Sequence, residues 1–471
     1  MVSTAQKSAP RLPHWRGEAR TIAILALPLI LTNFAHVALT TIDIVVLGTL
    51  GTLEIAAGGL AIALFNQLRT TGSGLVTGVS NLVAEAQARG EQQRVRDLLV
   101  AGFFWATVSG VVFAATLPLI EAPLVWLGQD PIVAAAAVHF LQIAAPGLVP
   151  CLWFQVLRHF TVGLKHPGPL LAITLISIAL TAGLNYLLVY GKFGLPALGL
   201  LGVALATSAV FLLSFLMFLT VVLRSPVLGP YFSRSGLRWS SDAVGAVWRL
   251  GLPIAGTYTS EAGFFSVLTL LIGTLGMEAL AAQTVLNQII YIVFMISAGI
   301  SHAASIHISE ACGTGDFRRA QRLGLVSLAL GIVAMLAIAL PYMVIPETIV
   351  SLFISADQQA NATTLALAAS GLLIAALLQI FDAGQNIGNG LLRGTGDTAG
   401  PFRISLVGYW LVGLPAAYLL GIAADYGIYG VWIGQTFGLA STAALLVISF
   451  RRRLQHLALR TTPNLAASNP L

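Results

Sequence analysis

The sequence predicts an all-α integral membrane protein, with twelve transmembrane helices in two six-helix lobes that repeat each other in parallel. Three observations support this fold class. Of 471 residues, 57% are hydrophobic and only 9% are charged, whereas soluble proteins average about 25% charged residues. Apolar runs longer than about 18 residues recur along the chain, which is typical of membrane spans. The same six-helix pattern also appears twice, about 225 residues apart.

The internal repeat aligns without gaps over its best-preserved stretch. The matching pairs are Pro28 with Pro253, Gly48 with Gly273, Gly74 with Gly299, Ser80 with Ser305, and Glu85 with Glu310. A duplicated membrane bundle has an interface between two similar halves, and alternating-access carriers place their substrate path at that interface. The repeat therefore favours a carrier.

The distribution of Lys and Arg predicts the topology. We expect spans at 21–47, 55–83, 98–119, 134–156, 168–190, 199–223, 247–274, 280–306, 323–344, 364–390, 402–421 and 429–449. The segments on the N-terminal side of these spans carry 22 of the 24 Lys and Arg, and the opposite side carries only Lys192. The positive-inside rule then places both termini in the cytoplasm. Because each half has an even number of spans, the two halves enter the membrane in the same direction.

This topology predicts the domain organisation. We expect a cytoplasmic N-terminal tail at 1–20, an N-lobe at 21–223, a cytoplasmic inter-lobe linker at 224–246, a C-lobe at 247–450 and a cytoplasmic C-terminal tail at 451–471. The first apolar run is too long for the core of a cleaved signal peptide. We expect a monomeric multi-pass protein of the cell membrane, which is the inner membrane in a Gram-negative bacterium.

Asp43 is the ionisable residue of the first span. An acidic group at bilayer depth costs roughly 2.5–3.5 kcal/mol on insertion scales, so it needs a reason to be there. Asn185 lies at a similar depth in the fifth span, and its amide could hydrogen-bond Asp43 if the two spans face each other. Asp43 could then load and release a proton. The alternative is that Asp43 sits at the water boundary and is simply solvated.

Two further acids, Glu261 and Asp382, lie in the seventh and tenth spans, both in the second half of the chain. Their depths, counted from the outer ends of the spans, differ by less than about 10 Å. They could converge on one cation such as Na⁺, or share protons because two buried carboxylates repel each other. The alternative is a single carboxyl group bonded to a neighbouring hydroxyl, such as that of Thr257 or Ser260.

A polar stripe follows the acid of the tenth span. Asp382, Gln385, Asn386 and Asn389 fall at positions i, i+3, i+4 and i+7, which is one face of a helix. Such a stripe either joins helices to one another or lines a water-filled cavity. Because the stripe begins with a carboxylate, Asp382, the cavity interpretation is favoured.

Arg69 is the one Lys or Arg that lies well inside a span and not at its end. It could line a cavity or reach an acidic group. Its counterpart in the repeat is Phe294, so the internal symmetry does not require a charge there. The sequence leaves the structural and functional interpretations of Arg69 equally open.

Several function classes are excluded or disfavoured. The chain has no phosphate-binding P-loop, which excludes an ATP-driven pump, and no HExxH motif, so we do not expect an enzyme. Cys151 and Cys312 alone make neither a disulfide framework nor a zinc site. The formal net charge is +6, but the basic residues are distributed between apolar spans and not gathered on one soluble face. We therefore expect no nucleic-acid partner. We expect no cofactor, and an ion gradient, of Na⁺ or H⁺, must supply the energy.

Certain segments of the chain resemble the multidrug and toxic compound extrusion (MATE) family. They are PLILTNFAHVALTTIDIVVLGTLG from Pro28, NYLLVYGKFGLPALGLLGVALAT from Asn185, VFMISAGISHAASI from Val293, and FDAGQNIGNGLLRGTGDT from Phe381. The resemblance covers roughly residues 22–451. It implies two six-helix lobes in a V, and export of lipophilic, often cationic, compounds in exchange for Na⁺ or H⁺.

The resemblance also implies roles for particular residues. Glu261 and Asp382 look like the C-lobe cation site of the NorM branch, and Asp43 and Asn185 look like the N-lobe pair associated with proton coupling. Gln288 stands where the family's span-8 asparagine is expected. Leu378 replaces a tyrosine found one turn before the span-10 acid in some relatives, which weakens the assignment to Na⁺.

Two other transporter classes deserve comparison. A flippase for a lipid-linked oligosaccharide, which has a related architecture, would need a basic cavity for its anionic pyrophosphate headgroup. The spans here contain three acids against one arginine. The major facilitator class typically has an Asp-Arg-Gly motif between spans 2 and 3, where this chain reads EAQARGEQQRVRD.

Overall fold

The computed structural model describes residues 15–126, 128–167, 169–194, 196–232, 238–353 and 362–466, and it is helical almost throughout these ranges. The long helices of the first half are α1 (Trp15–Gly48), α2 (Thr52–Ala88), α3 (Gln92–Thr116), α5 (Pro131–Ala144) with α6 (Leu148–Gly163), α7 (Pro169–Tyr190) and α8 (Leu200–Arg224). Those of the second half are α9 (Ser241–Gly273), α10 (Met277–Gly313), α11 (Phe317–Val344), α13 (Ala362–Gly394), α14 (Ala399–Leu406) with α15 (Leu414–Tyr418), and α16 (Gly427–Ala466). Two short helices, α4 (Glu121–Trp126) and α12 (Pro346–Ser351), lie in connections.

Twelve helical segments of membrane-spanning length match the twelve expected spans in the described ranges. Ten of them are both long and apolar enough to cross a membrane by composition alone. The other two, α2 and α9, fall short because they carry more charged, polar and glycine residues. These two helices also pack against each other across the molecule, so their less apolar faces contact protein instead of lipid.

Two of the spans are not continuous α-helices. The fourth consists of α5 and α6, joined by a 3₁₀ turn at Ala145–Gly147 that contains Pro146, which has no N–H for an α-helical hydrogen bond. In the eleventh, π-helical turns at Val407–Gly413 and Leu419–Ala423 flank α15. π-Helical turns inside a helix are rare and often occur at functional sites.

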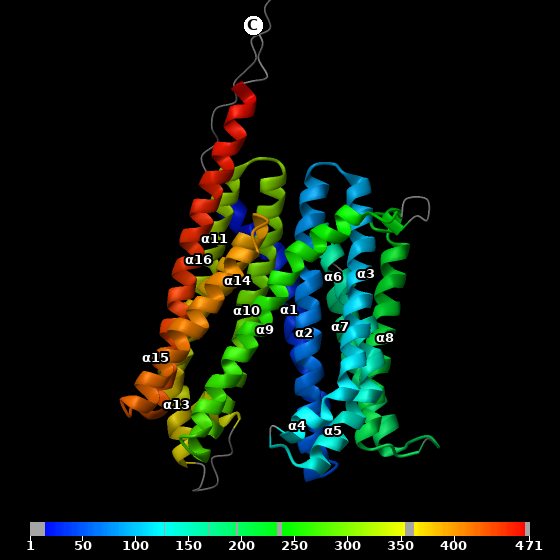
Figure 1. Ribbon diagram of the computed structural model, residues 1–471, viewed down its shortest axis with the longest axis vertical. Helices are drawn as coiled ribbons and strands as arrows, with labels where there is room; N and C mark the ends of the chain where they lie inside the picture. Colours follow the sequence, from blue (N-terminus) through cyan, green and yellow to red (C-terminus); the bar gives the residue numbers. More distant parts are fainter. Residues whose placement is uncertain are drawn as a thin grey trace, which may run out of the picture.

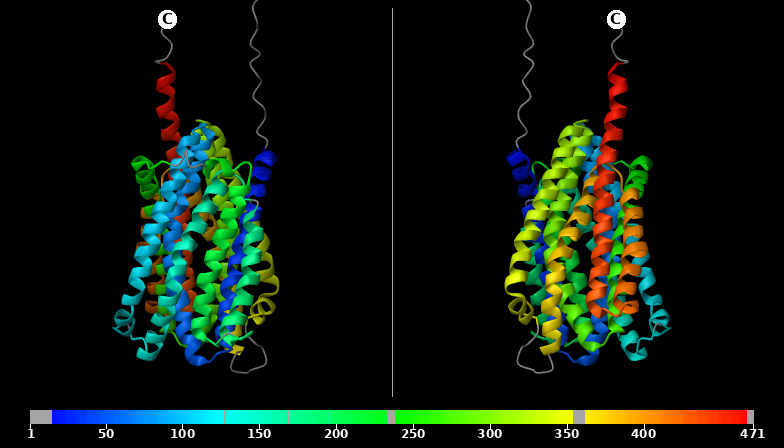
Figure 2. Two further views of the ribbon diagram at one scale, coloured as in Figure 1. Left: turned by 90° about the vertical axis from the view of Figure 1, so that its right-hand side faces the viewer. Right: turned by 90° about the vertical axis from the view of Figure 1, so that its left-hand side faces the viewer.

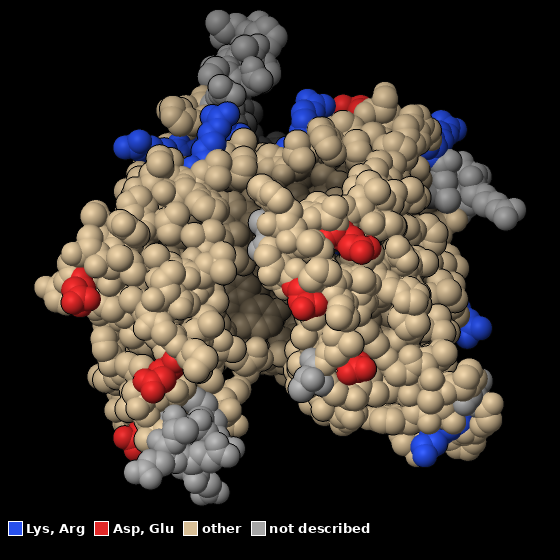
Figure 3. Space-filling view, turned by 60° about the horizontal axis from the view of Figure 1, so that its bottom comes forward, with Lys and Arg blue, Asp and Glu red and all other residues tan. Residues whose placement is uncertain are grey.

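The helices form two bodies side by side (Figure 1), which confirms the predicted two-lobed fold. The N-lobe contains α1 to α8, and the C-lobe contains α9 to α16. The beginning of α1 and the end of α16 lie at the same end of the bundle (Figure 2), as an even number of spans requires. We call this the terminal end. From the opposite end, Figure 3 shows a deep hollow between the two bodies.

Some of the predicted boundaries fall on residues outside the described ranges. These include 1–14 of the N-terminal tail, 233–237 of the inter-lobe linker and 467–471 of the C-terminal tail. On the C-terminal side of the linker, α9 begins at Ser241, with the Ser240 hydroxyl accepting a hydrogen bond from the Ala243 N–H. At the other end of the chain, α16 continues past the expected end of its span to Ala466.

Close backbone contacts join the lobes, and they follow the internal repeat. A Cβ atom at Gly74 of α2 would lie 2.7 Å from the Cα of Ala255 in α9, and one at Gly299 of α10 would lie 2.3 Å from the Ile30 side chain in α1. Gly74 and Gly299 are counterparts in the repeat, as are Ile30 and Ala255. The glycines therefore let α2 approach α9, and α10 approach α1, in a pseudo-symmetric way.

Charged and polar contacts reinforce the lobe interface near the terminal end. Lys165, which follows α6 in the N-lobe, pairs with Glu310 of α10 at 2.7 Å. Glu18 of α1 pairs with Arg322 of α11 at 2.9 Å. The Asn81 amide of α2 donates to the Ser305 hydroxyl at 2.6 Å. The interface is thus closed at the terminal end and open toward the hollow of Figure 3.

Candidate functional site

Glu261 and Asp382 lie inside the C-lobe, within electrostatic reach of each other. Glu261 is on α9 and is partly buried, while Asp382 is on α13 and is 3% exposed. The two carboxylates are near enough for their charges to interact. Neither has an ion pair with Lys or Arg in the described part of the chain, and Oδ1 of Asp382 has no hydrogen-bond partner there. This arrangement leaves two acidic side chains without a basic partner in the described part of the chain.

In this structure, the hydroxyl groups of Thr257 and Ser260 on α9 form hydrogen bonds with partners other than Glu261. The Thr257 hydroxyl donates to the Pro253 carbonyl oxygen at 2.9 Å. The Ser260 hydroxyl accepts from Nε1 of Trp410 at 2.9 Å. The simpler expectation, a carboxyl group satisfied by these neighbours, therefore does not fit the observed contacts.

Tyr409 is a site residue that the sequence analysis missed. It lies in the π-helical turn Val407–Gly413 and is fully buried. Its ring stacks on Phe264 with a centroid separation of 5.0 Å and an interplanar angle of 9°, and its hydroxyl accepts a hydrogen bond from the Gln385 amide. Both acids lie within electrostatic reach of that hydroxyl. The one available clue was the adjacent Tyr409–Trp410 pair between Gly408 and Gly413.

The polar stripe on α13 has two different parts. Asn386 joins helices, because its side-chain amide donates to the Ser297 hydroxyl at 3.1 Å and its backbone carbonyl oxygen accepts from the Ser301 hydroxyl at 2.7 Å. Gln385 joins α13 to Tyr409 through its amide N–H, but its Oε1 is buried without a donor in the described residues. The same is true of Oδ1 of Asn389. Unsatisfied acceptors thus run along the stripe from Asp382.

Gln288 does not join this group. Its side chain is exposed, and the neighbouring Asn287 is the residue that turns into the C-lobe. Asn287 accepts from the Gln283 amide at 3.0 Å and donates to the Thr269 hydroxyl at 3.3 Å. One position along a helix rotates a side chain by about 100°, so a shift of one residue separates the predicted residue from the inward-facing amide.

In the N-lobe, α1 and α7 bring Asp43 and Asn185 together. The Asn185 amide donates to Oδ1 of Asp43 at 2.8 Å, and Asn185 is fully buried. Thus the two spans do face each other, and Asp43 is partly buried instead of lying free in bulk water. Its other surroundings form a cavity within the N-lobe.

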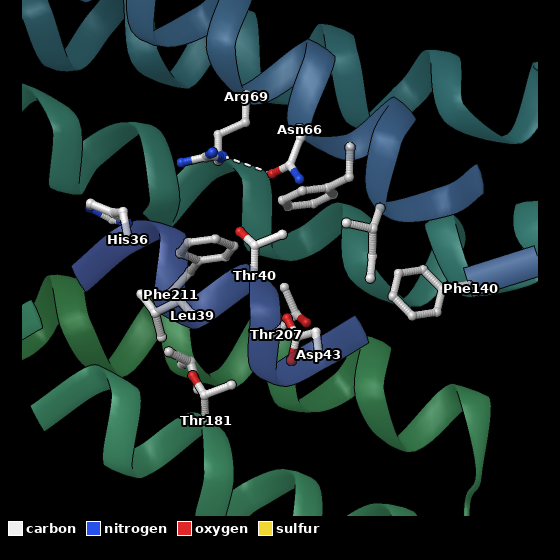
Figure 4. Close-up of a pocket in the computed structure, with 13 residues that line it drawn as sticks. His36, Leu39, Thr40, Asp43, Asn66, Arg69, Phe140, Thr181, Thr207 and Phe211 are labelled. Carbon is white, nitrogen blue, oxygen red and sulfur yellow. Dashed lines mark hydrogen bonds between the residues drawn. The ribbon is translucent and has the colours of Figure 1, made fainter. Parts of the chain in front are cut away.

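The N-lobe cavity is small, with a volume of about 60 Å³, and it is open on one side. Figure 4 shows its polar groups, which are spread along its length. The lining residues are His36, Leu39, Thr40, Asp43, Ile62, Phe65, Asn66, Arg69, Phe140, Thr181, Thr207, Val210 and Phe211.

The donor set at the acids suits a small hard cation or a proton. The described residues contain no group of three or more His, Cys, Asp or Glu side chains that could hold a metal ion. Two carboxylates and an unsatisfied amide oxygen, at Glu261, Asp382 and Gln385, nevertheless offer oxygen atoms, which hard cations prefer. A proton on Asp382 would instead provide a donor for one of the unsatisfied acceptors.

Together, the two-lobed bundle, the hollow between the lobes and the interior acids define a multi-pass membrane protein with the architecture of a transporter. A family profile named MatE matches residues 28–187 and 253–419. The chain belongs to the MatE family.

Curated relatives extend over nearly the whole chain. A "Probable multidrug resistance protein NorM" of Pseudomonas aeruginosa is 36% identical over 96% of this chain and 93% of its own length. Another protein with the same name, from Rhizobium meliloti, is 35% identical over 94% of this chain and 95% of its own length. The resemblance that the sequence segments suggested is therefore confirmed at the level of the family, whose members are transporters and not enzymes.

Solved structures share the fold. A crystal structure of MATE in complex with MaL6 superposes with a TM-score of 0.86, at 18% identity, over 93% of this chain and 97% of the other. The eukaryotic MATE transporter AtDTX14 gives a TM-score of 0.81, at 22% identity, over 95% and 99% of the two chains. At these identities, the comparison establishes the fold alone.

Proposed function

We propose that the protein exports lipophilic cationic compounds in exchange for Na⁺ or H⁺, by alternating access between the two lobes. The observation that carries this proposal is that Glu261 and Asp382 lie within electrostatic reach of each other and have no basic partner among the described residues. The names of the NorM relatives, which are called multidrug resistance proteins, support the same function.

In this mechanism, the substrate cation and the coupling ion compete for the same two carboxylates, Glu261 and Asp382. Two uncompensated carboxylates in a poorly solvated interior attract a substrate cation, and the attraction falls when Na⁺ or protons neutralise them. Binding of the coupling ion then favours release of the substrate into the open hollow. After the lobes reopen at the terminal end, the coupling ion dissociates and the acids can bind the next substrate.

The direction of export follows from the topology. We propose that the terminal end faces the cytoplasm of the cell, because 22 of the 24 Lys and Arg belong to segments on that side. The open hollow in Figure 3 then faces outward. We also propose that a single chain is sufficient for transport, since each chain has both lobes and the acids of both.

The test is substrate efflux from liposomes that contain the purified protein, under an imposed pH or Na⁺ gradient. A fluorescent lipophilic cation should leave against its own gradient when either driving ion is supplied. The Asp382→Asn and Glu261→Gln variants should lose coupled efflux while keeping normal expression and elution, because the charge is used and the shape is preserved. Full activity in Asp382→Asn would contradict the proposal.

Matched controls remove similar charges elsewhere. Asp425 and Glu278 are exposed residues at connections, so Asp425→Asn and Glu278→Gln should leave efflux unchanged. The alternative function, a flippase for a lipid-linked oligosaccharide, predicts lipid movement that does not depend on the imposed gradient. Such movement, without ion-driven efflux of the cation, would replace the proposed function.

A further inference from the structure

Four basic side chains gather where the N-lobe meets the C-lobe, toward the terminal end. Arg158 and His159 belong to the last turns of α6, whereas His302 lies on α10 and Arg393 is in the last turn of α13. The rings of His159 and His302 have centroids 6.0 Å apart, and Nη2 of Arg393 lies 3.5 Å from Nδ1 of His302. Arg158 lies within electrostatic reach of both imidazoles. A pair from the N-lobe thus faces a pair from the C-lobe, and we call the four residues the inter-lobe basic cluster.

No acid neutralises the two arginines of this cluster within the described ranges of the chain. Neither Arg158 nor Arg393 takes part in any of the ion pairs found there. Arg393 donates to two neutral hydroxyl groups, those of Ser305 at 3.1 Å and Tyr258 at 3.4 Å. Arg158 donates from Nη2 to Oδ1 of Asn33 at 2.7 Å. Charges removed from bulk water normally have a partner of opposite sign, because an unpaired one is costly.

The cluster also has unused hydrogen-bond donors. Nε and Nη1 of Arg158 have no acceptor in the described residues, and neither atom is fully buried. Because Nδ1 of His302 accepts a hydrogen bond from Arg393, the Nε2 of a neutral His302 carries the ring proton, and it too has no described acceptor and is not fully buried. Arg158 and His302 are both partly exposed. Donors from both lobes therefore border space that a small solute can enter.

We propose that the inter-lobe basic cluster binds one small inorganic anion, chloride, between the two lobes. Guanidinium N–H groups form strong, charge-assisted hydrogen bonds to anions. The proposed exchange of cations has no use for these positive charges, so the anion site goes beyond it.

The position of the cluster gives the anion a conformational effect. Arg158 and His159 move with the N-lobe, and His302 and Arg393 move with the C-lobe, so the four side chains meet only while the lobes are in contact here. Without an anion, the two arginines repel each other across the interface. Bound chloride removes this repulsion and stabilises the arrangement that is closed at the terminal end, since a ligand favours the state that binds it better.

The experiment measures binding of radiolabelled chloride to purified full-length protein in detergent, without any gradient. Gluconate replaces chloride to keep the ionic strength constant, and protein-free micelles give the background. Wild-type protein should show saturable binding, and chloride should raise its thermal stability as the site fills. Arg158→Gln should weaken the affinity for chloride by about tenfold or more, the size of a lost charge-assisted hydrogen bond.

Two further variants separate the site from folding and from general surface charge. Arg393→Lys keeps the charge but loses the planar fork, and it should give an intermediate affinity. Arg318→Gln removes an exposed arginine of α11 and should bind chloride like wild-type protein. Thermal unfolding in gluconate reports whether each variant is folded before chloride is added.

The conformational effect has its own measurement, which uses cysteines at Thr71 and Thr259. The hydroxyl groups of these residues lie 2.9 Å apart across the lobe interface. In a protein without other cysteines, the pair should cross-link faster in chloride than in gluconate, and Arg158→Gln should abolish the difference. Equal rates in both salts for the otherwise wild-type protein would overturn the stabilising role of the anion.

Three results would overturn the anion site itself. The first is wild-type protein without saturable chloride binding. The second is an affinity that is unchanged in Arg158→Gln, or lowered equally in Arg318→Gln, because chloride would then be a general counter-ion. The third is binding of acetate without binding of chloride, which would assign the cluster to a carboxylate. None of these results depends on cation efflux, so the proposed function stands or falls separately.

Discussion

The Asn185 amide donates a hydrogen bond of 2.8 Å to Oδ1 of Asp43 and thereby joins α7 to α1 inside the N-lobe. Because Asn185 is fully buried, this amide remains a fixed donor for the carboxylate. Asp43 also lines the N-lobe cavity, which is open on one side. We therefore propose that Asp43 exchanges a proton with this cavity while Asn185 holds it in place.

Asp43→Asn should reduce proton-driven efflux more than Na⁺-driven efflux, because the amide cannot bind and release a proton while the C-lobe acids remain intact. The comparison uses one preparation of the variant under a pH gradient and under a Na⁺ gradient. Asp425→Asn provides the matched control. Equal losses under both gradients would show that Asp43 has no separate role in proton coupling.

Changing both C-lobe acids should cost little more than changing one. If Glu261 and Asp382 act as one unit, either single variant already disables it, and the double variant Glu261→Gln/Asp382→Asn adds no further loss. The measurement is the initial rate of coupled efflux in a double-mutant cycle. Single variants with partial activity whose losses multiply in the double variant would indicate two independent sites.

Tyr409→Phe should impair coupling without unfolding the C-lobe. Phenylalanine preserves the stacking on Phe264, while the Gln385 amide loses its acceptor. Losing one buried hydrogen bond costs roughly 1–3 kcal/mol. We expect a reduced efflux rate with near-normal thermal stability in detergent. A variant with wild-type rates would remove Tyr409 from the site, and Tyr418→Phe, at an exposed tyrosine of the same span, is the control.

A disulfide across the lobe interface should stop transport reversibly. The hydroxyl groups of Thr71 in α2 and Thr259 in α9 lie 2.9 Å apart, so cysteines at these positions come within bonding range. In a background without Cys151 and Cys312, the Thr71→Cys/Thr259→Cys variant should lose efflux on oxidation and recover it on reduction. Each single cysteine variant is a control. Undiminished efflux from fully cross-linked protein would rule out separation of the lobes at this contact.

Much of the fold could be predicted from the sequence, because hydropathy and charge act over whole helices. The repeat and the twelve spans follow from the sequence pattern, and the similar depths of Asp43 and Asn185 are accurate to a few residues. Whether the two spans face each other depends on helix rotation, which the sequence left open and the hydrogen bond shows. Gln288 shows the limit of such reasoning. Its depth identifies the right turn of α10, but the inward-facing amide belongs to Asn287, one residue away.

Other features depend on backbone irregularity or on three-dimensional packing. The π-helical turn at Val407–Gly413 changes which face of the span points inward, so no regular helical pattern could place Tyr409 beside the acids. The division of the α13 stripe also depends on partners from other helices. Ser297 accepts a hydrogen bond from the Asn386 side chain, whereas Oδ1 of Asp382 remains without a donor in the described residues.

The central claim, that uncompensated interior acids exchange a small cation for a large one, is tested most directly by measuring both movements at once. Purified protein is placed in liposomes that contain a fluorescent lipophilic cation together with reporters of luminal pH and Na⁺. We predict that expulsion of the dye acidifies the lumen or brings Na⁺ into it in wild-type protein, and that neither occurs in Asp382→Asn. Expulsion of the dye without either ion movement would contradict the account.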